Sequence, residues 1–283
     1  MRGGFELSLT CKRIIEELNK LAPVELAEEW DNVGLIIGDP QQSINKVLIC
    51  LDVTTDVVDY AIEQKVDMII SHHPLIFSSI KRIVYGEWKS NLIYRLIESH
   101  ISLYSAHTNL DYAKSGVNWS LARALKLENI RNAGYMKRIP SPGIHLEHEE
   151  YYSLAKTGIL KPPLKLTDFI EHVKQALNVD HVRFVGKAED LRNKEISKVM
   201  VFSGSFDEDI LHYVNQEIDI IVTGDLKHHT AIEMLEKGIC ALDAGHFSTE
   251  NIIVPVLAKM LKEKFPELDV IGKFDAIKPF ILC

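Results

Sequence analysis

Short apolar segments alternate with amphipathic segments along most of the chain. The segments KVLICLD, VDMIISHHP, ISLYSAHTNLD, SKVMVFSG and IDIIVTGD have the composition of buried strands. Between them lie segments with the helical spacing of apolar residues, among them VTTDVVDYAIEQK, SNLIYRLIESH, GVNWSLARALKL, LTDFIEHVKQAL, SFDEDILHYVNQE and HHTAIEMLEKG. Strands this apolar, separated by such helices, predict an α/β protein with mostly parallel sheets covered on both faces.

The two ends of the chain continue this alternation. Thr10 can cap a helix that ends before Pro23. Near the other end, ICALDAGH predicts a strand, a final helix begins at about Thr249, and DVIGKFD predicts a last strand. The short segment HVRFVG is a further expected strand.

The alternation is interrupted between residues 135 and 165. The segments RIPSPGIHLEHEEYY and GILKPPLKL are rich in Pro, Gly and charged residues, which is typical of irregular structure. We therefore expect two interleaved lobes: an N-terminal α/β lobe over 1–134, an irregular boundary with a helix and a short strand over 135–190, and a C-terminal α/β lobe over 191–283.

Composition narrows the class of protein. The chain has 283 residues, 46% of them hydrophobic, so it can bury a large core. Its apolar runs are too short to span a membrane, and no secretory signal is visible at its start. Four scattered cysteines without CxxC spacing indicate free thiols in a reducing cytoplasm. A net charge of −8 without a basic tract argues against nucleic acid as the main partner.

Residues of the types that ligate metals follow four of the predicted strands. In open α/β sheets, functional groups gather at the carboxyl ends of the strands. The candidates are His72 and His73 after DMIIS, His107 and Asp111 in AHTNLD, Asp225, His228 and His229 in TGDLKHH, and His246 and Glu250 in DAGHFSTE.

This set fits a site for two metal ions. Neighbouring side chains of an extended segment point to opposite sides, so His72 and His73 are expected to contact two ions rather than share one. The carboxylates of Asp111 and Glu250 supply oxygen ligands for a pair of cations. His246 and Glu250 are four residues apart, so a helix that begins this early places both on one face.

Each of these motifs also has a simpler interpretation. A lone His-His pair is more often the capped end of a strand than a metal site. The segment TGDLKHH could be only the start of a helix, with Asp225 as N-cap and solvated histidines. The segment HLEHEE, with His145, Glu147, His148, Glu149 and Glu150, carries ligand-type residues, but we expect a solvated acidic loop because no rigid element would hold it.

Other catalytic classes lack their sequence motifs. The chain has no GxxxxGK[ST] loop, no GxGxxG after a strand and no GxSxG elbow. The segment SGSF at 203–206 does not have the spacing of glycines that the elbow requires.

Taken in order, WDNVGLIIGD, CLDVT, IISHHPLIF, AHTNLD, GVNWSLA, TGDLKHHTA and GHFSTE resemble the Nif-three-like dinuclear metal centre family, also known as GTP cyclohydrolase type 2 homologues. The resemblance spans about Cys11 to Leu261. It implies two α/β lobes around a cleft with two metal ions, in a toroidal homohexamer. Longer members carry an inserted mid-chain domain, whereas this chain resembles the compact form.

The resemblance also implies roles for individual residues. The family's metal ligands fall on the residues reached above: His72, His73, Asp111, His246 and Glu250. His107 and His229 match positions that line the cleft, and Trp30, Asp31 and Asn32 match the first loop. Two departures are visible: FSGSF replaces a GGSG loop, which puts a role of that loop in substrate contact in doubt, and Asn118-Trp119 replaces Asn-Asp.

These observations lead to a hypothesis about function. We expect a metal-dependent hydrolase in which a water bridging two divalent ions attacks the substrate and His107 or His229 transfers protons. The mixed ligands suit zinc, manganese, iron or cobalt. The resemblance suggests a small-molecule substrate, a purine nucleotide, with a GTP cyclohydrolase type 2-like activity. The alternatives are a non-catalytic hexameric scaffold or regulatory protein that binds metal, and a metal-dependent phosphoesterase.

Overall fold

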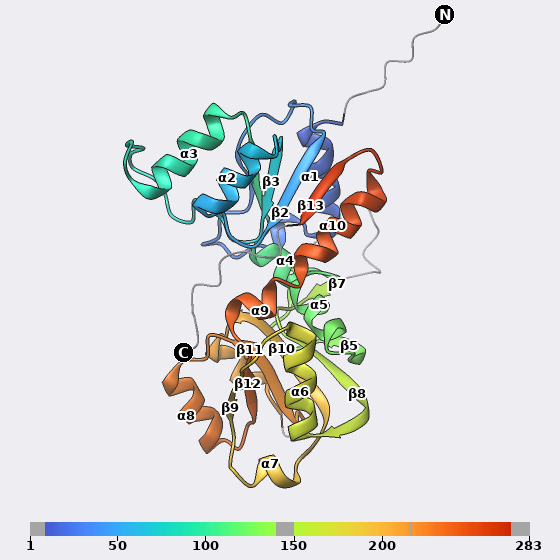
Figure 1. Cartoon of the computed structure of the whole chain (residues 1–283). Coiled ribbons are helices and arrows are strands. Elements are labelled where there is room, and N and C mark those ends of the chain that lie inside the picture. Colours follow the sequence, from blue (N-terminus) through green and yellow to red (C-terminus); the bar gives the residue numbers. More distant parts are fainter. Residues whose placement is uncertain (1–8, 140–149, 216, 273–283) are drawn as a thin grey trace, which may run out of the picture. The chain divides into compact units, whose positions relative to one another are not determined.

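The computed structural model describes residues 9–139, 150–215 and 217–272. The chain forms two compact units, Met1–Leu110 with Val254–Cys283, and Asp111–Ile253 (Figure 1). We call these unit 1 and unit 2. The passage from one to the other lies earlier than the predicted lobe boundary, and the C-terminal segment belongs with the N-terminal one.

Unit 1 is built on a five-stranded sheet of order β1-β4-β3-β2-β13. The pairs β13–β2, β2–β3 and β3–β4 are parallel, and β1 pairs with β4 antiparallel. Its elements are α1 (Cys11–Leu21), η1 (Val24–Leu26), β1 (Gly34–Ile37), β2 (Lys46–Cys50), α2 (Thr55–Glu63), β3 (Met68–Ser71), α3 (Trp88–Glu98), β4 (Ser102–Ser105), α10 (Ile253–Lys264) and β13 (Asp269–Gly272).

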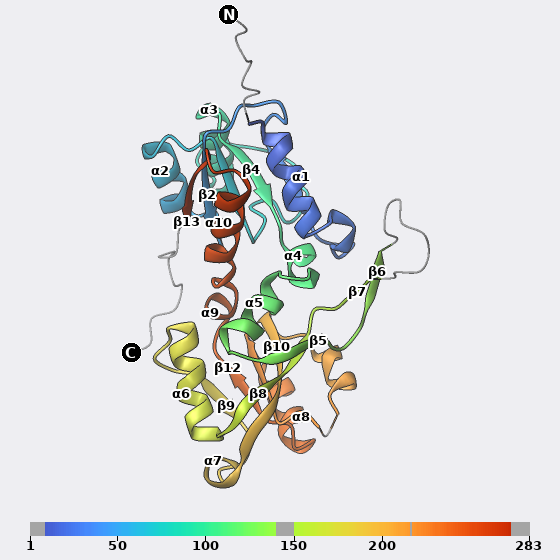
Figure 2. The same ribbon diagram turned by 90° about the vertical axis from the view of Figure 1, so that its right-hand side faces the viewer.

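Helices cover both faces of this sheet, as the continuous apolar strands predict. Leu48 and Ile69 pack with α2 and α3 in one buried cluster. On the opposite side lies α1 (Figure 2), and the hydroxyl of Tyr104 donates a hydrogen bond of 2.8 Å to Asn19 of that helix. The predicted cap of α1 is confirmed, since the Thr10 side chain accepts from the Arg13 amide.

Unit 2 is built on a six-stranded sheet of order β5-β8-β10-β11-β12-β9. Only β10–β11 and β11–β12 are parallel, whereas the other pairs are antiparallel. Its elements are α4 (Thr108–Tyr112), which begins in unit 1, α5 (Val117–Ala124), β5 (Glu128–Asn132), β6 (Lys137–Ile139), β7 (Glu150–Tyr152), β8 (Lys156–Lys165), α6 (Leu166–Leu177), β9 (Arg183–Val185), α7 (Asp190–Asn193), β10 (Glu195–Ser205), η2 (Glu208–Tyr213), β11 (Ile220–Gly224), α8 (His228–Glu236), β12 (Ala241–Asp243) and α9 (His246–Glu250).

Alternate residues of β10 face two separate cores. Val199 and Val201 pack in the cluster that includes residues of α5 and α6, and Met200 and Phe202 pack in the cluster that includes residues of η2 and α8. The two-residue period of a strand explains why one segment supplies both cores.

The α/β fold with layered helices is confirmed, and three details differ from prediction. The second sheet is mixed rather than mostly parallel. The segment GILKPPLKL lies in strand β8, except for Leu166, which begins α6. The prolines of β8 occupy a stretch where the register with β10 shifts between Ile196 and Lys198. Proline is tolerated there because no ladder hydrogen bond is needed. Among the described residues of SFDEDILHYVNQE, the predicted α-helix is replaced by the 3₁₀ helix η2. Residues 140–149, with most of HLEHEE, lie outside the described residues.

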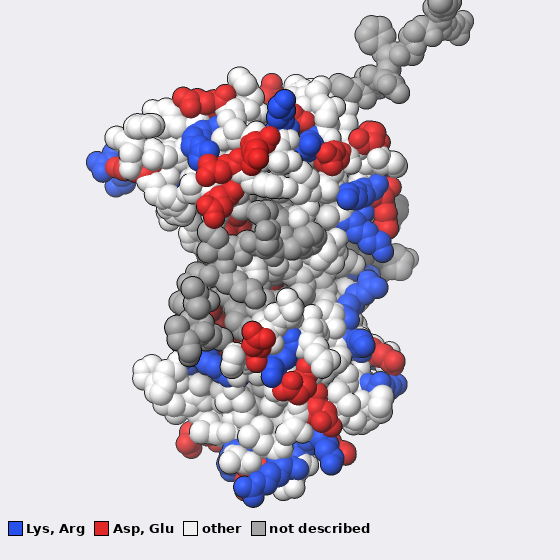
Figure 3. Space-filling model, in the orientation of Figure 1, with Lys and Arg blue, Asp and Glu red and all other residues white. Residues whose placement is uncertain are grey.

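The distribution of charged side chains and the state of the described cysteines agree with the predictions from the sequence. Basic and acidic side chains are interspersed on the face drawn in Figure 3. Cys11, Cys50 and Cys240 are free and buried. No helix within the described ranges has the length and apolar character needed to cross a membrane.

Candidate metal centre

The carboxyl ends of two neighbouring parallel strands, β3 and β4, bring together the histidines of unit 1. His72 and His73 directly follow β3, and His107 follows β4. Their ligand-type nitrogens lie within 4.8 Å of one another. The ring centroids are 4.9 Å apart for His72 and His73, 5.2 Å for His72 and His107, and 5.4 Å for His73 and His107. This trio can therefore offer several nitrogens to one ion.

The rings of His72 and His73 lie 4.9 Å apart instead of on the opposite sides that a strand period predicts, and their expected contact with two ions stays a prediction. Strand β3 ends at Ser71, and the two histidines lie in a bend, where the alternation of an extended strand no longer applies. The backbone amides of His72 and His73 donate to Cys50 and Leu51 at the end of β2, which fixes the bend. Both rings consequently join the same cluster.

Each histidine of this trio donates its Nδ1–H to an acceptor of unit 1. His72 donates to the carbonyl of Ala106 at 2.8 Å, and His73 donates to the carboxylate of Asp52 at 2.8 Å. His107 donates to Asp31 at 2.9 Å. An acceptor at Nδ1 keeps the proton there and leaves Nε2 as a lone-pair donor, which is the arrangement found around metal-bound histidines.

Asp31 is held ionised for this task. Its carboxylate is fully buried and also accepts from the amide of Thr108 at 3.0 Å and from its hydroxyl at 2.5 Å. Burial alone would raise the pKa of Asp31, but the hydrogen bonds from His107 and Thr108 outweigh it and lower the pKa to about 2. Asp31 therefore orients His107 at any physiological pH.

The first loop contributes to this edge of unit 1 through its other residues as well. The Asn32 amide donates to the carbonyl of Ile76 at 2.5 Å, which ties the loop to the segment after the histidines. The exposed Trp30 ring lies 5.6 Å from Phe77 and 6.2 Å from His107, measured between centroids. Asp31 and Trp30 thus lie against His107, whereas Asn32 contacts the segment after His73.

Unit 2 carries a second set of donors, on the short helix α9 that follows β12. The Nε2 atom of His246 lies 2.9 Å from Oε2 of Glu250, so the predicted pairing on one helical face is confirmed. His246 Nδ1–H donates to Asp225 at 2.8 Å. Asp225 follows β11, has a positive φ of 43° and is not a helix cap, since α8 begins after Lys227.

A cation between His246 and Glu250 fits this geometry. With its proton on Nδ1, the imidazole turns a lone pair toward a buried carboxylate. That contact is repulsive unless a proton or a metal ion lies between the two atoms. Ligand atoms about 2.0–2.1 Å from one ion lie about 3.4 Å apart at the tetrahedral angle, so these two atoms would separate by a few tenths of an ångström to share such an ion.

A glycine makes room for the Glu250 carboxylate. Gly204, at the end of β10, has a φ of +69°, and its amide donates to Thr249 at 3.0 Å. A Cβ at this position would lie 2.0 Å from Oε1 of Glu250 and 3.5 Å from Nε2 of His246. The FSGSF segment therefore has a steric role beside the donors of unit 2.

The remaining predicted residues are Asp111 and His229, and a ligand atom of Asp111 lies within 4.8 Å of one of Glu250. Asp111 is the first residue of unit 2 and is buried in α4. Lys156 is buried; desolvation lowers its pKa to about 7, and the charge of Asp111 partly opposes that shift. His229 is exposed on the first turn of α8, beside His228. Within the described part of the chain, the structure gives His229 no place in a donor cluster.

Sequence reasoning missed two supporting residues. Asp52, which orients His73, follows the strand KVLIC, so its position at a strand end was the available signal. Lys156 carries no motif that distinguishes it from a surface lysine.

Comparison with known proteins agrees with these features. The model of the Duf34/NIF3 (NGG1p interacting factor 3) family matches residues 9–277. The chain belongs to the Duf34/NIF3 family. As a family member, it is 32% identical over 257 residues to a "GTP cyclohydrolase 1 type 2 homolog" of Clostridium acetobutylicum, which covers 90% of this chain and 91% of that protein.

Two solved structures share the fold of this Duf34/NIF3 chain. Staphylococcus aureus protein SA1388 has a TM-score of 0.85 and 30% identity, with 97% of this chain and 99% of that chain covered. A Bacillus cereus protein related to NIF3 has a TM-score of 0.85 and 26% identity, with the same coverage. The predicted resemblance and the compact α/β fold are therefore confirmed.

Proposed function

We propose that this Duf34/NIF3 protein is a metal-dependent hydrolase that holds two divalent ions and acts on a purine nucleotide, as a GTP cyclohydrolase type 2-like enzyme. The observation that carries the proposal is the hydrogen bond made by Nδ1 in each of four histidines. His72, His73, His107 and His246 each have Nδ1 engaged by an acceptor of their own unit. Histidines whose Nδ1–H is held by a carbonyl or carboxylate in this way are the arrangement found around metal centres.

The proposed ligands are His72, His73, Asp111, His246 and Glu250. Two of these residues lie close in sequence to the points where the chain passes between the units. The chain leaves unit 1 between Leu110 and Asp111, and returns between Ile253 and Val254. Asp111 begins the first passage, and Glu250 lies shortly before the second. Zinc, manganese, iron and cobalt all suit imidazole and carboxylate ligands.

When bound, two such ions lower the pKa of a water molecule and stabilise negative charge on the substrate. Residues of the chain would transfer the protons. Asp31 keeps a proton on Nδ1 of His107, so Nε2 of His107 can accept a proton from the reacting water. We favour His107 over His229 for proton transfer because His229 is exposed on α8 and belongs to no described donor cluster.

We also propose that the chain forms a homohexamer in the cytoplasm. The free, buried cysteines support a reducing compartment. The segment 77–97 of unit 1 exposes large apolar side chains, including Tyr85 at 84% and Trp88 at 56%. Exposed groups of this kind are typical of surfaces that bind another protein, and a second copy of the chain is the partner that the family resemblance suggests.

The test combines metal analysis with turnover. Wild type, Glu250→Ala and His72→Ala are purified identically, their metal content is measured, and GTP with a panel of nucleotides and phosphoesters is assayed. His181→Ala, which removes an exposed histidine of unit 2, is the control. We expect both site variants to lose metal and turnover, and the control to keep them.

Each other outcome has a definite meaning. Full metal occupancy in Glu250→Ala would refute the ligand assignment. Two ions bound per chain without turnover of any substrate would replace the hydrolase with the scaffold or regulatory protein. Turnover of phosphoesters alone would replace the cyclohydrolase with a phosphoesterase.

A further inference from the structure

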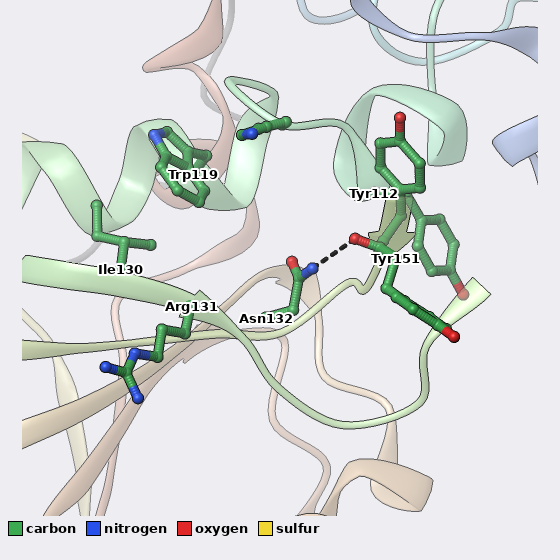
Figure 4. Close-up of a pocket in the computed structure, with 8 residues that line it drawn as sticks. Tyr112, Trp119, Ile130, Arg131, Asn132 and Tyr151 are labelled. Carbon is green, nitrogen blue, oxygen red and sulfur yellow. Dashed lines mark hydrogen bonds between the residues drawn. The ribbon is translucent and has the colours of Figure 1, made fainter. Parts of the chain in front are cut away.

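The pocket of unit 2 drawn in Figure 4 does not gather its charged groups around one point. Arg131 points away from Ile130 and Asn132, its neighbours in β5, as the two-residue period of a strand requires. The Tyr112 ring in the pocket wall is covered by the ammonium of Lys137, 4.6 Å from its centre. The carboxyl ends of β11 and β12 in the same unit are different, because polar groups from several segments meet there at a single side chain.

That side chain is Asp243, which is buried and ends β12. Its Oδ1 accepts a hydrogen bond of 2.9 Å from the amide of Gly245, and its Oδ2 accepts one of 3.0 Å from the amide of Leu226. The guanidinium of Arg183 donates to the same Oδ2 and, at 3.3 Å, to the carbonyl of Leu226. One carboxylate therefore joins the loop after β11 to the loop after β12.

The two amides that Asp243 holds lie next to residues of the proposed metal centre. Gly245 directly precedes the proposed ligand His246 and is the N-cap of its helix. Leu226 directly follows Asp225, whose carboxylate accepts from Nδ1 of His246 at 2.8 Å. The backbone φ is +43° at Asp225 and +85° at Gly245, so both loops have conformations that surrounding contacts must hold in place.

We propose that Asp243 is a positioning residue of the metal centre, because it fixes the loop of His246 against the loop of Asp225. The Asp225 carboxylate then holds the imidazole so that Nε2 of His246 stays beside Glu250, 2.9 Å from its Oε2. This role rests on the proposed function, since it requires His246 to be a metal ligand. The hydrogen bonds of Asp243 themselves do not depend on that function.

Unit 2 contains a similar carboxylate bridge away from the strand ends that carry metal donors. Asp219 precedes β11, and its Oδ2 accepts from the amides of Ser197 and Lys198, both at 2.8 Å. It therefore joins two segments as Asp243 does, but at the amino end of β11, whereas Asp225 and His246 follow the carboxyl ends of β11 and β12. The pair Asp243 and Asp219 separates an effect on the metal centre from an effect on the fold.

The test titrates metal-free full-length protein with Co²⁺ and follows its visible absorption, which depends on the ligands of the ion and their geometry. His246→Ala identifies the part of the spectrum that depends on that imidazole. Asp243→Asn keeps the size of the side chain but replaces one acceptor oxygen with an NH₂ group, so one amide loses its acceptor. We expect this variant to bind that Co²⁺ at least about 10-fold more weakly and with an altered spectrum, because groups that orient a ligand typically contribute roughly 10–100-fold to affinity.

Two controls accompany this variant. Asp219→Asn makes the same chemical change in the similar bridge and should bind Co²⁺ as wild type does. Arg183→Ala removes a side chain that is 71% exposed, so it should fold even if Asp243→Asn does not. It should weaken Co²⁺ binding by about threefold, the size expected of a partly exposed ion pair, whereas Arg192→Ala, which removes an exposed arginine of α7, should not.

A double variant tests whether Asp243 acts through the contact between Asp225 and His246. In protein that already carries Asp225→Asn, we expect Asp243→Asn to weaken Co²⁺ binding by a smaller factor than it does alone. Factors that multiply in full would overturn the proposal.

The remaining outcomes are equally definite. Equal Co²⁺ affinity in Asp243→Asn and wild type, equal losses in Asp243→Asn and Asp219→Asn, or equal affinity in Arg183→Ala and Arg192→Ala would each overturn the proposal. Wild type that binds no Co²⁺ would overturn it together with the proposed function. Wild type that binds Co²⁺ but turns over no substrate would remove the hydrolase alone, and the expected losses of affinity would still support the role of Asp243.

Discussion

Replacing Gly204 with alanine tests the steric arrangement around Glu250. The new Cβ would lie 2.0 Å from Oε1 and 3.0 Å from Cδ of Glu250. Because carbon and oxygen atoms do not approach this closely without a bond, the carboxylate must move by more than 1 Å. Glu250 then leaves the position beside Nε2 of His246 from which the two would hold an ion.

The positive φ of Gly204 adds a second cost that must be separated from the first. A left-handed residue with a side chain costs roughly 1–2 kcal/mol. Gly238 has a φ of +70°, close to that of Gly204, but a Cβ there meets nothing within 4 Å. Gly238→Ala therefore carries the backbone cost alone and is a matched control.

The expected results differ between the two variants. Gly238→Ala should lose about 1–2 kcal/mol of unfolding free energy in metal-free protein, and Gly204→Ala should lose more because its Cβ also displaces Glu250. Because moving even a supporting group costs 10–100-fold in metal affinity, we expect Gly204→Ala to bind metal at least about 100-fold more weakly, and Gly238→Ala to bind as wild type does. Competition with a chromophoric chelator measures the affinity, and denaturant unfolding measures the stability. Equal metal affinity in the two variants would refute the argument.

Three further predictions concern other parts of the molecule. Asp225→Asn should weaken metal binding by about 10–100-fold, because the Nδ1–H of His246 loses a carboxylate acceptor; unchanged affinity in a chelator competition would contradict this. From pH 7 to pH 9, the unfolding free energy of metal-free wild type should rise by about 2 kcal/mol relative to that of Lys156→Met. The reason is that the unfolded lysine, with a pKa of about 10.4, keeps a proton that the folded lysine releases. An equal change in unfolding free energy for both proteins, measured by urea unfolding at the two pH values, would count against it. Trp88→Glu should reduce the mass of the assembly measured by light scattering, and a hexamer that persists would exclude that surface from the interface.

Periodicity alone predicted most of the fold. The strands ending at Cys50, Ser71 and Gly224 are continuous apolar runs, because a strand buried on both faces needs apolar side chains at nearly every position. Strand β8 was missed because its prolines normally exclude a strand, and only the shifted register next to β10 makes room for them. Register is a property of two segments, so one segment's composition does not contain it.

Some features of the candidate site could also be predicted from the sequence, and others could not. The donors were predictable because strand ends converge and because His246 and Glu250 are one helical turn apart. The close pairing of His72 with His73 was not, since it depends on a bend fixed by hydrogen bonds to the end of β2. The buried position of Lys156 was also hidden, because burial of a lysine depends on acceptors from distant segments.

The pairing of β13 with β2 has a consequence for the order of folding during synthesis. Lys46 lies opposite Asp269 in this parallel pair, and their side chains form an ion pair of 3.1 Å. Unit 2 is continuous, so all its residues are available once the ribosome has passed Ile253, whereas the sheet of unit 1 must wait for the last strand. Until then β2 is an open edge, and such edges recruit other chains. A nascent chain that stalls before Asp269 is therefore the form of this protein most prone to aggregate.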